Sequence, residues 1–485
     1  MSRRLKQGPG QFLAEVGTLS ARPSFVDGHA KGAVEALLIP PDGLRRFLIT
    51  EAELGERIMR ALILRRVSLI ESDSGGVVLI GPPDAPGVLR LQSFLSRNGL
   101  PHYLLDPETD SQAKDLVARH KPSPSELPLA VALDGTVLRN PSDHALGLAL
   151  GMITPPSDDT VYDVAIVGAG PAGLSTAVYA ASEGLLVTVL DRWAFGGQAG
   201  ASARIENYLG FPTGISGQAL AGRAYVQSMK FGAELMIPVE AKLLDCSRKD
   251  GNFAINAEDG MTIRARAVVV ASGARYRRPA IEKLESFEGR GVWYWASPIE
   301  ARLCINEEVI LVGGGNSAGQ AAVFLASHAR KVRMMVRGDG LAATMSRYLI
   351  ERIEAARKME LMTHTEVTKL EGDPDKGLER VHWKNNKSGK QDSAPVHNLF
   401  LFIGADPATG WLAGCGVELD KAGFVVTGSK CSQANALNPL QSSVAGVFAV
   451  GDVRAGSIKR VGSGIGEGAQ VVAALHRYLA PEENV

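Results

Sequence analysis

The chain has few cysteines, the residues that build disulfide scaffolds and many metal centres. Among its 485 residues there are four cysteines, and none of them stands in a C-x-x-C or metal-ligand spacing: Cys246, Cys304, Cys415 and Cys431. We therefore expect each of them to be a small buried apolar residue. No metal site is predicted.

Neither sign of charge is in excess, and long apolar runs are missing. Lys plus Arg and Asp plus Glu number 52 each, which leaves no basic surface for nucleic acid and no acidic tail. No apolar run is long enough to cross a bilayer, and residues 1–6 lead into no signal-peptide core. These shortages argue against nucleic-acid and membrane partners and predict a cytoplasmic protein, whose length favours roughly three domains.

Glycine, by contrast, is plentiful, and one glycine cluster follows an apolar run typical of a buried strand. Residues 163–167 lead into this G-x-G-x-x-G cluster, and a helical pattern and a second apolar run, 186–190, follow it. Such glycines allow a tight turn, close approach to a pyrophosphate and close helix–strand packing, and an acidic residue after the second strand accepts a ribose hydroxyl. The residues predicted to bind this dinucleotide are Gly168, Gly170, Pro171, Ala172, Gly173, Asp191 and Arg192.

A second cluster of the same kind lies at 308–318, and a further apolar run ends in Gly451 and Asp452. One such cluster is a weak signal, but two clusters, each between a strand pattern and a helix pattern, predict two bound dinucleotides. The residues predicted to bind the second dinucleotide are Gly313, Gly315, Asn316, Ser317 and Ala318.

From Asp163 to the C-terminus, about two thirds of the chain, the sequence resembles the low-molecular-weight thioredoxin reductases. Besides the two clusters, the matching motifs are Gly196-Gly197-Gln198, Ile205-Glu206-Asn207, Ala271-Ser272-Gly273 and Gly451-Asp452-Val453. The resemblance implies a homodimer in which an FAD domain is split in sequence around an NADPH domain. It also implies that Asp452 binds the ribityl–phosphate region of FAD, and that further contacts to the cofactor come from Gly197, Gln198, Asn207, Gly273 and Gly451.

The expected fold class is α/β, with two Rossmann-like dinucleotide-binding domains preceded by a partial β-roll with helices and a thioredoxin-fold-like domain. The expected segments are 1–72 for a partial cyclic-nucleotide-binding-like region, 73–153 for a thioredoxin/glutaredoxin-like domain without cysteine, 158–275 for the first part of the FAD domain, 276–398 for the NAD(P)H domain and 399–485 for the second part of the FAD domain.

The first of these segments resembles the phosphate-binding cassette of a cyclic-nucleotide-binding domain at residues 8–19, where Glu15 matches the ribose-binding carboxylate. The phosphate-binding arginine, however, falls on Ser24, and Arg22 stands two residues away. The first strands of the roll are also missing from the sequence. We therefore expect this region to bind no cyclic nucleotide.

Residues 77–152 resemble a glutaredoxin-like domain, with Pro128 placed like the cis-proline of that fold. Ala85 and Val88 occupy the positions of its redox cysteines. The resemblance therefore implies a redox-silent domain with a structural or docking role.

The segment after Gly291-Val-Trp-Tyr294 departs from the thioredoxin reductases, which carry Cys-Ala-Thr-Cys there. This chain has Trp295-Ala-Ser-Pro298 instead. Because neither end of the motif forms a thiolate, the usual electron relay cannot exist, and we expect no conventional thioredoxin reductase activity. Trp295 is either a catalytic-site aromatic that stacks on the flavin or a side chain that fills a domain interface.

A second departure precedes the last helical pattern, where Lys459-Arg460-Val461 replaces the Arg-Gln-Ala of the family. The resemblance implies that this helix points its N-terminus at the flavin pyrimidine. Lys459 and Arg460 are accordingly predicted to act in catalysis by stabilising the anionic reduced flavin, and Val461 to contact the cofactor. In this replacement the chain resembles a subgroup of reductase-like flavoproteins that are fused to cyclic-nucleotide-binding regions.

Together these patterns predict an FAD-dependent oxidoreductase that takes hydride from NADPH without an internal C-x-x-C. NADPH is favoured over NADH because no carboxylate ends the strand at 332–336 and Arg337 follows it, whereas Arg333 is expected on the other side and Arg347 is more distant. The sequence does not identify the electron acceptor. It is either a protein that accepts one electron at a time, as for the ferredoxin–NADP reductases, or oxygen, a quinone or a substrate disulfide. A non-catalytic flavoprotein acting as a redox sensor or scaffold is the alternative.

Overall fold

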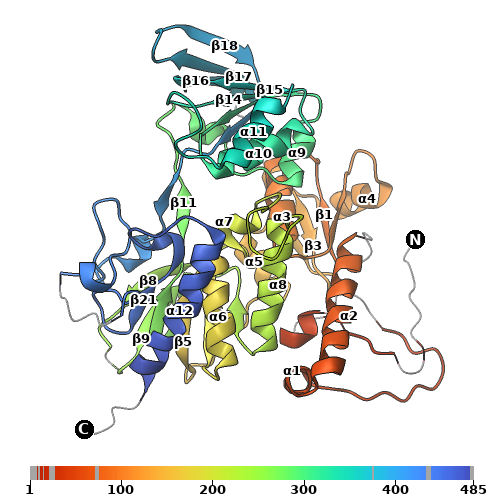
Figure 1. Cartoon of the computed structure of the whole chain (residues 1–485). Helices are drawn as coiled ribbons and strands as arrows, with labels where there is room; N and C mark the ends of the chain where they lie inside the picture. The colour runs from red at the N-terminus through yellow and green to blue at the C-terminus, as the bar shows by residue number, and fades with distance from the viewer. Residues whose placement is uncertain are drawn as a thin grey trace. The chain divides into compact units, whose positions relative to one another are not determined.

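The structure, a computed structural model, describes residues 8, 11–14, 16–20, 24, 28–71, 76–248, 250–373, 376–432 and 438–480. The chain forms two compact units (Figure 1). The first unit comprises residues 1–197, 221–273 and 408–485, and the second comprises 198–220 and 274–407. Within the described ranges, no helix has the length and apolar character that a membrane crossing needs.

The main sheet of the first unit has the strand order β7-β6-β5-β10-β9-β8, and β21 pairs with β10. Strands β7, β6, β5, β10 and β21 are parallel, and β9 and β8 add an antiparallel edge. The central strands are buried apolar runs, as expected for a parallel sheet covered by helices. The strands are β5 (Val161–Val167), β6 (Val187–Leu190), β7 (Glu234–Met236), β8 (Ala241–Asp245), β9 (Phe253–Ala257), β10 (Thr262–Val270) and β21 (Val447–Ala449).

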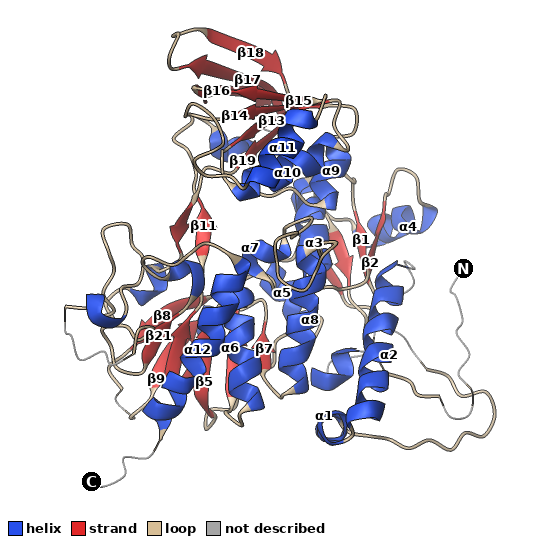
Figure 2. Cartoon of the chain, in the orientation of Figure 1, coloured by secondary structure: helices blue, strands red, loops and turns tan. Residues whose placement is uncertain are grey.

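Two helices, α6 (Pro171–Ser182) and α12 (Val461–Leu479), pack closely together beside this sheet (Figure 2). A Cβ atom on Gly468 would lie 2.3 Å from the backbone oxygen of Ala172, so only glycine permits this approach. Ser175 Oγ also donates to the Ile465 carbonyl oxygen at 2.8 Å. Helix α6, which begins directly after β5, is thereby fixed at the carboxyl end of the central strand.

The N-terminal part of the first unit contains a separate four-stranded sheet with the order β2-β1-β3-β4. Strand β1 is parallel to β2 and antiparallel to β3, which is antiparallel to β4. The Leu127–Pro128 peptide bond is cis, at the position where the glutaredoxin-like pattern predicts it. The elements are β1 (Val77–Ile80), α3 (Pro86–Arg97), β2 (His102–Leu105), α4 (Ser111–His120), η2 (Pro124–Glu126), β3 (Leu129–Val131), β4 (Val137–Arg139) and α5 (Asp143–Ala149).

The prediction of a partial β-roll before this sheet is wrong for the described residues. Those that precede Val77 form η1 (Val16–Ser20), α1 (Pro41–Thr50) and α2 (Ala52–Glu71), and no strand. The physical reason is that residues 28–40 are exposed and have no neighbouring strand to pair with. Of the residues considered for cyclic-nucleotide binding, Ser24 is exposed, and Glu15 and Arg22 lie outside the described residues.

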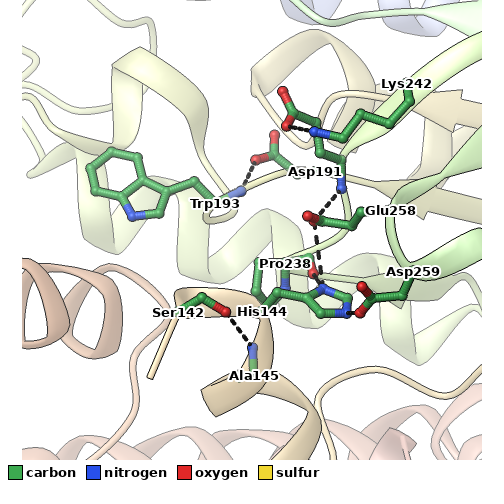
Figure 3. Close-up of polar contacts among 10 residues, drawn as sticks. Ser142, His144, Ala145, Asp191, Trp193, Pro238, Lys242, Glu258 and Asp259 are labelled. Carbon is green, nitrogen blue, oxygen red and sulfur yellow. Dashed lines mark hydrogen bonds and ion pairs between the residues drawn. The ribbon is translucent and has the colours of Figure 1, made fainter. Parts of the chain in front are cut away.

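The region at 73–153 does not form a compact unit of its own, because its hydrophobic core is continuous with that of the main sheet. Leu91 and Phe94 of α3 belong to the same buried cluster as Tyr162 of β5. A polar contact supports the junction: His144 Nδ1 donates to the Pro238 carbonyl oxygen at 2.9 Å, and His144 Nε2 lies 2.6 Å from Asp259 Oδ2 (Figure 3).

The second unit contains a parallel sheet with the order β12-β19-β13-β14-β15 and a three-stranded antiparallel sheet, β16-β17-β18. A two-stranded ribbon, β11 (Ala274–Tyr276) with β20 (Ala405–Pro407), stands where the chain enters and leaves this unit. The other strands are β12 (Val292–Trp293), β13 (Glu308–Val312), β14 (Lys331–Met335), β15 (Met359–Met362), β16 (Thr365–Asp373), β17 (Gly377–Asn385), β18 (Gln391–Pro395) and β19 (Asn398–Leu401).

The predicted boundary between residues 398 and 399 is too early. Strand β19 pairs with β12 and β13 and therefore belongs to the inserted sheet, and the chain returns to the first unit at Ala408. The helices not yet given are α7 (Gly197–Gly200), α8 (Gly217–Lys230), α9 (Pro298–Leu303), α10 (Asn316–Ala326), α11 (Arg347–Ala355), η3 (Glu258–Gly260), η4 (Leu284–Phe287), η5 (Gly410–Leu412), η6 (Gly428–Lys430) and η7 (Gly451–Val453).

Candidate dinucleotide sites

The first glycine cluster makes a sharp turn from β5 into α6. Gly168 has a φ of +114°, and a Cβ atom there would lie 2.2 Å from the Ala271 carbonyl oxygen. A Cβ atom on Gly173 would lie 1.8 Å from the Gly168 oxygen. A Cβ atom on Gly170, by contrast, would come no closer than 4.0 Å to its nearest neighbour, the Gly197 Cα, and Gly170 precedes a helix end that has no side-chain cap. The free N–H groups of α6 can therefore hold an anionic pyrophosphate.

Asp191, at the end of β6, is held by backbone N–H groups. Its Oδ1 accepts from the Trp193 N–H at 3.0 Å (Figure 3). The Ala194 N–H donates to the same oxygen at 3.2 Å, and Oδ2 accepts from the Ala169 N–H at 2.9 Å. Burial raises the pKa of this carboxyl, while the three N–H groups act in the opposite direction. Because a carboxylate has about four acceptor positions, one remains for a ribose hydroxyl. The neighbouring Arg192 is exposed.

Asp452 lies in η7, directly after β21. The Gly451 N–H donates to Glu467 Oε2 of α12 at 2.7 Å, and Arg454 forms an ion pair with the same carboxylate. Burial raises the pKa of Asp452, and no described residue donates a hydrogen bond to its carboxylate. A half-buried carboxylate without a protein donor fits the hydroxyl groups of a ribityl chain. Glu467 was not predicted, because nothing in its local sequence shows that it supports Gly451.

The residues at the N-terminus of α12 lie beside Asp452. Lys459 Nζ donates to the backbone oxygen of Asp452 and, at 2.9 Å, to Ser457 Oγ. Burial lowers the pKa of Lys459. Arg460 is the exposed N-cap residue, and Val461 is the first residue of the helix. The structure thus brings two cationic side chains to a helix end that has no side-chain cap.

Arg97, at the end of α3, contacts the loop that follows β6. Its guanidinium lies 4.3 Å from the ring centre of Trp193 and donates to the Gly197 carbonyl oxygen. The next residue, Asn98, donates from Nδ2 to the Trp193 oxygen at 3.0 Å. Gly197 in turn packs on Gly170, since a Cβ atom on Gly197 would lie 3.1 Å from the Gly170 Cα. The N-terminal region therefore supports the first glycine cluster, a role that no local sequence pattern indicates.

The second glycine cluster makes an equivalent turn from β13 into α10. Gly313 has a φ of +143°, and a Cβ atom there would lie 2.4 Å from the Phe402 carbonyl oxygen. Asn316 Oδ1 accepts from the Ser346 N–H at 2.7 Å, which ties the helix start to the loop before α11. A Cβ atom on Gly315 would meet no described atom within 4 Å, and the helix end has no side-chain cap. Ser317 is exposed and Ala318 is buried.

Three arginines were considered for the 2′-phosphate of NADPH. Arg337 follows β14 by two residues and is exposed. Arg333 forms ion pairs with Glu308 at 2.5 Å and Glu360 at 3.5 Å. Arg347 pairs with Glu351 one helical turn away. Of the three, Arg337 is the one without an ion pair among the described residues, and it lies at the strand end where a ribose would be bound.

The predicted flavin contacts at 196–207 and 271–273 are divided between the units. Gly197 and Gly273 belong to the first unit, and Gln198 and Asn207 belong to the second. Gln198 Nε2 donates to the Ala274 carbonyl oxygen, and Asn207 is exposed. Gly273 has a φ of +64° and open space where a side chain would stand.

Trp295 lies before α9, where the resemblance to the thioredoxin reductases places their first cysteine. Its Nε1 donates to Glu300 Oε1 at 3.0 Å, and Glu300 is 2% exposed. The other oxygen of Glu300 accepts from the Ser297 N–H at 2.9 Å and from the Ser297 hydroxyl, which completes a capping box. Pro298 is the first residue of the helix, where its missing N–H costs nothing.

Two open glycine turns, each before an uncapped helix at the carboxyl end of a parallel sheet, define a protein that binds two nucleotides. The model of the pyridine nucleotide-disulphide oxidoreductase family matches residues 162–468, and the chain belongs to this family. It is a member of mixed α/β fold with Rossmann-like sheets, as the sequence predicts.

Individual proteins similar to this chain are consistent with its membership of the family. Thioredoxin reductase from Mycolicibacterium smegmatis is 32% identical over 327 residues, which cover 67% of this chain and 99% of that protein. Thioredoxin reductase from Treponema pallidum is 32% identical over 326 residues, which cover 67% of this chain and 100% of that protein. The solved structure of Lactococcus lactis thioredoxin reductase has a TM-score of 0.60 at 28% identity, covering 66% of this chain and 99% of that one.

The chain is therefore an oxidoreductase of thioredoxin reductase-like fold, and the predicted cofactors, FAD and NADPH, are those of the thioredoxin reductases. The open glycine turns, the donor-free carboxylate of Asp452 and the exposed Arg337 fit these cofactors. The match begins after the N-terminal sheet, so residues 1–161 lie outside the family model.

Proposed function

We propose that this protein is an FAD-dependent NADPH oxidoreductase that reduces its acceptor without an internal C-x-x-C dithiol. The observation that carries the proposal is the Trp295–Pro298 segment, which replaces the two thiols with a capped helix start in a chain that otherwise has the family's nucleotide turns. When bound, FAD supplies the chemistry by accepting a hydride from NADPH and passing electrons on.

The residues of the chain have distinct roles in this proposal. Gly170 and the N-terminus of α6 hold the pyrophosphate of FAD, and Asp452 holds its ribityl hydroxyls. Lys459 and Arg460 stabilise negative charge on the reduced cofactor. In the second unit, the N-terminus of α10 holds the pyrophosphate of NADPH and Arg337 its 2′-phosphate.

Anaerobic stopped-flow mixing of the holoprotein with NADPH tests this function. Prompt bleaching of the flavin absorbance is expected, and its absence would favour a redox sensor or scaffold. A screen of acceptors on the reduced protein, covering oxygen, a quinone, a ferredoxin-type protein and a small disulfide, then identifies the class of substrate.

The same preparation is expected to show negligible reduction of thioredoxin by NADPH. The reason is that neither Trp295 nor Pro298 can form the mixed disulfide that a relay needs. A Cys304→Ser variant is the control, because Cys304 is the cysteine nearest to this segment in sequence. Robust thioredoxin reduction that survives this substitution would contradict the proposal.

A further inference from the structure

Two cysteines that are far apart in sequence meet in the first unit. Cys246 directly follows β8, and Cys415 lies three residues after η5; these two elements pack against each other. Cys415 is 8% exposed and belongs to the buried cluster that contains Trp411 and Leu412. Cys246 is half-buried and packs against the same cluster. The two thiols are close enough to interact, and each is the largest influence on the pKa of the other.

The surroundings give the two sulfurs different chemistry. The interaction with Cys246 lowers the pKa of Cys415 to about 7, with help from the Val417 N–H and against the effect of burial. The same interaction, together with burial, raises the pKa of Cys246. The lower pKa makes Cys415 the more readily ionised and more nucleophilic sulfur of the pair, and Cys246 is the thiol that can react with its oxidised form.

The other two cysteines have no such neighbour. Cys304 Sγ donates to the Glu300 carbonyl oxygen at 3.3 Å, and burial raises the pKa of its thiol to about 12. Cys431 Sγ donates to the Val426 oxygen at 3.5 Å, and burial raises its pKa as well. Both are buried thiols that bond to backbone oxygens, so they serve as internal controls.

We propose that Cys246 and Cys415 form a reversible intramolecular disulfide, with hydrogen peroxide as the oxidant. The Cys415 thiolate attacks one peroxide oxygen, the O–O bond breaks, and Cys415 becomes a sulfenic acid while the other oxygen leaves as water after protonation. The Cys246 thiol, losing its proton, then attacks the Cys415 sulfur and displaces the hydroxyl as a second water. Two thiols and one peroxide thus give one disulfide and two waters.

The bond would fix the point at which the chain re-enters the first unit. Ser272 Oγ donates to the Ala408 carbonyl oxygen at 2.7 Å, and Thr409 Oγ1 donates to the Gly423 oxygen at 2.9 Å. A disulfide at Cys415 adds a covalent tie between this segment and β8. Because the closed loop is long, the tie lowers the entropy of the unfolded chain and stabilises the unit.

The full chain, treated with hydrogen peroxide or with diamide, tests the proposal. After alkylation of free thiols and digestion without reductant, mass spectrometry is expected to find the peptide of Cys246 linked to that of Cys415. The oxidised protein is expected to melt about 5 °C higher, and dithiothreitol is expected to reverse the shift. Oxidation should accelerate as the pH rises through about 7, because the Cys415 thiolate then forms.

Variants make the assignment specific. Cys246→Ser and Cys415→Ser are expected to abolish both the linked peptide and the thermal shift, and Cys431→Ser is expected to leave both unchanged. A Cys415 that stays reduced or reaches only a sulfinic acid, or that links to Cys304 or Cys431, would overturn the proposal. Should a serine variant fail to fold, the peptide map of the unsubstituted chain decides alone.

Discussion

A half-buried carboxylate without a protein donor, such as that of Asp452, costs free energy unless a ligand donates to it. Its neighbour Gly451 is anchored by Glu467 on α12, so the backbone that presents the carboxylate is rigid. At the scale of single residues, the binding of FAD is therefore expected to depend more on the side chain of Asp452 than on that of the exposed Arg192.

Replacing Asp452 with Ala is expected to remove most of the FAD from the purified protein, because the ribityl hydroxyls lose their acceptor. The ratio of flavin absorbance to protein absorbance measures the loss. Asp158→Ala, which changes an exposed carboxylate outside the candidate site, is the matched control. A D452A protein that retains its full complement of FAD would show that Asp452 has been given the wrong role.

Replacing Trp295 with Ala is expected to increase flavin fluorescence and to speed the oxidation of reduced flavin by oxygen. The reason is that an indole stacked on the flavin, one of the two roles that the sequence allows for Trp295, would quench the flavin and cover it from oxygen. Trp295→Phe keeps an aromatic ring, so its flavin fluorescence and its rate of oxidation by oxygen are expected to be close to those of the unsubstituted protein. Identical fluorescence and oxidation rates in the W295A variant would rule out this covering role.

At the scale of elements, the end of α3 and the loop after β6 form one support for the first glycine cluster. Arg97 stacks on Trp193 and bonds to Gly197, which packs on Gly170. The helix therefore reaches the predicted FAD site through backbone that it holds in place.

Replacing Arg97 with Ala is expected to raise the dissociation constant for FAD about tenfold, as the loss of a charged hydrogen bond and a cation–π contact implies. Fluorescence titration of the flavin-free protein measures the change. Arg119→Ala, an exposed arginine on the neighbouring α4, is the control. Equal affinities for R97A and R119A would show that the loop holds its shape without α3.

The elements also show how far the sequence predicts this structure. Both glycine turns were predictable, because the strand, the turn and the helix start are adjacent in sequence. The place of β19 and the contacts of Arg97 were not, because both depend on partners about a hundred or more positions away in the chain. The prediction of a β-roll from residues 8–19 failed because a sequence pattern like a phosphate-binding cassette does not supply the strands that must pair around it.

At the scale of the whole molecule, the N-terminal sheet and the main sheet share one buried cluster, although only the main sheet belongs to the family model. His144 adds a polar contact at this junction. The N-terminal region is thus built into the first unit rather than tethered to it, which suits a structural role better than that of an independent ligand-binding domain.

Cyclic AMP and cyclic GMP are therefore expected to leave the melting temperature and the rate of NADPH oxidation unchanged. A ligand that binds only the folded protein raises the melting temperature once its concentration exceeds its dissociation constant. Thermal melts over a range of nucleotide concentrations measure this, with FAD added to flavin-free protein as the positive control. A dose-dependent shift with either cyclic nucleotide would refute the expectation, and Arg22→Ala would then be the first variant to examine.

The capping box before α9 has a consequence for protein engineering. Substituting cysteine for Trp295 and Pro298 would restore the sequence of the missing motif. The substitution of Pro298 would break no hydrogen bond, because proline has no N–H. The indole of Trp295, however, is a donor to the buried Glu300, and a cysteine there would leave one carboxylate oxygen without that donor. Restoring the dithiol would thus remove a donor from a buried carboxylate, so the two substitutions act on the start of α9 as well as on the redox chemistry.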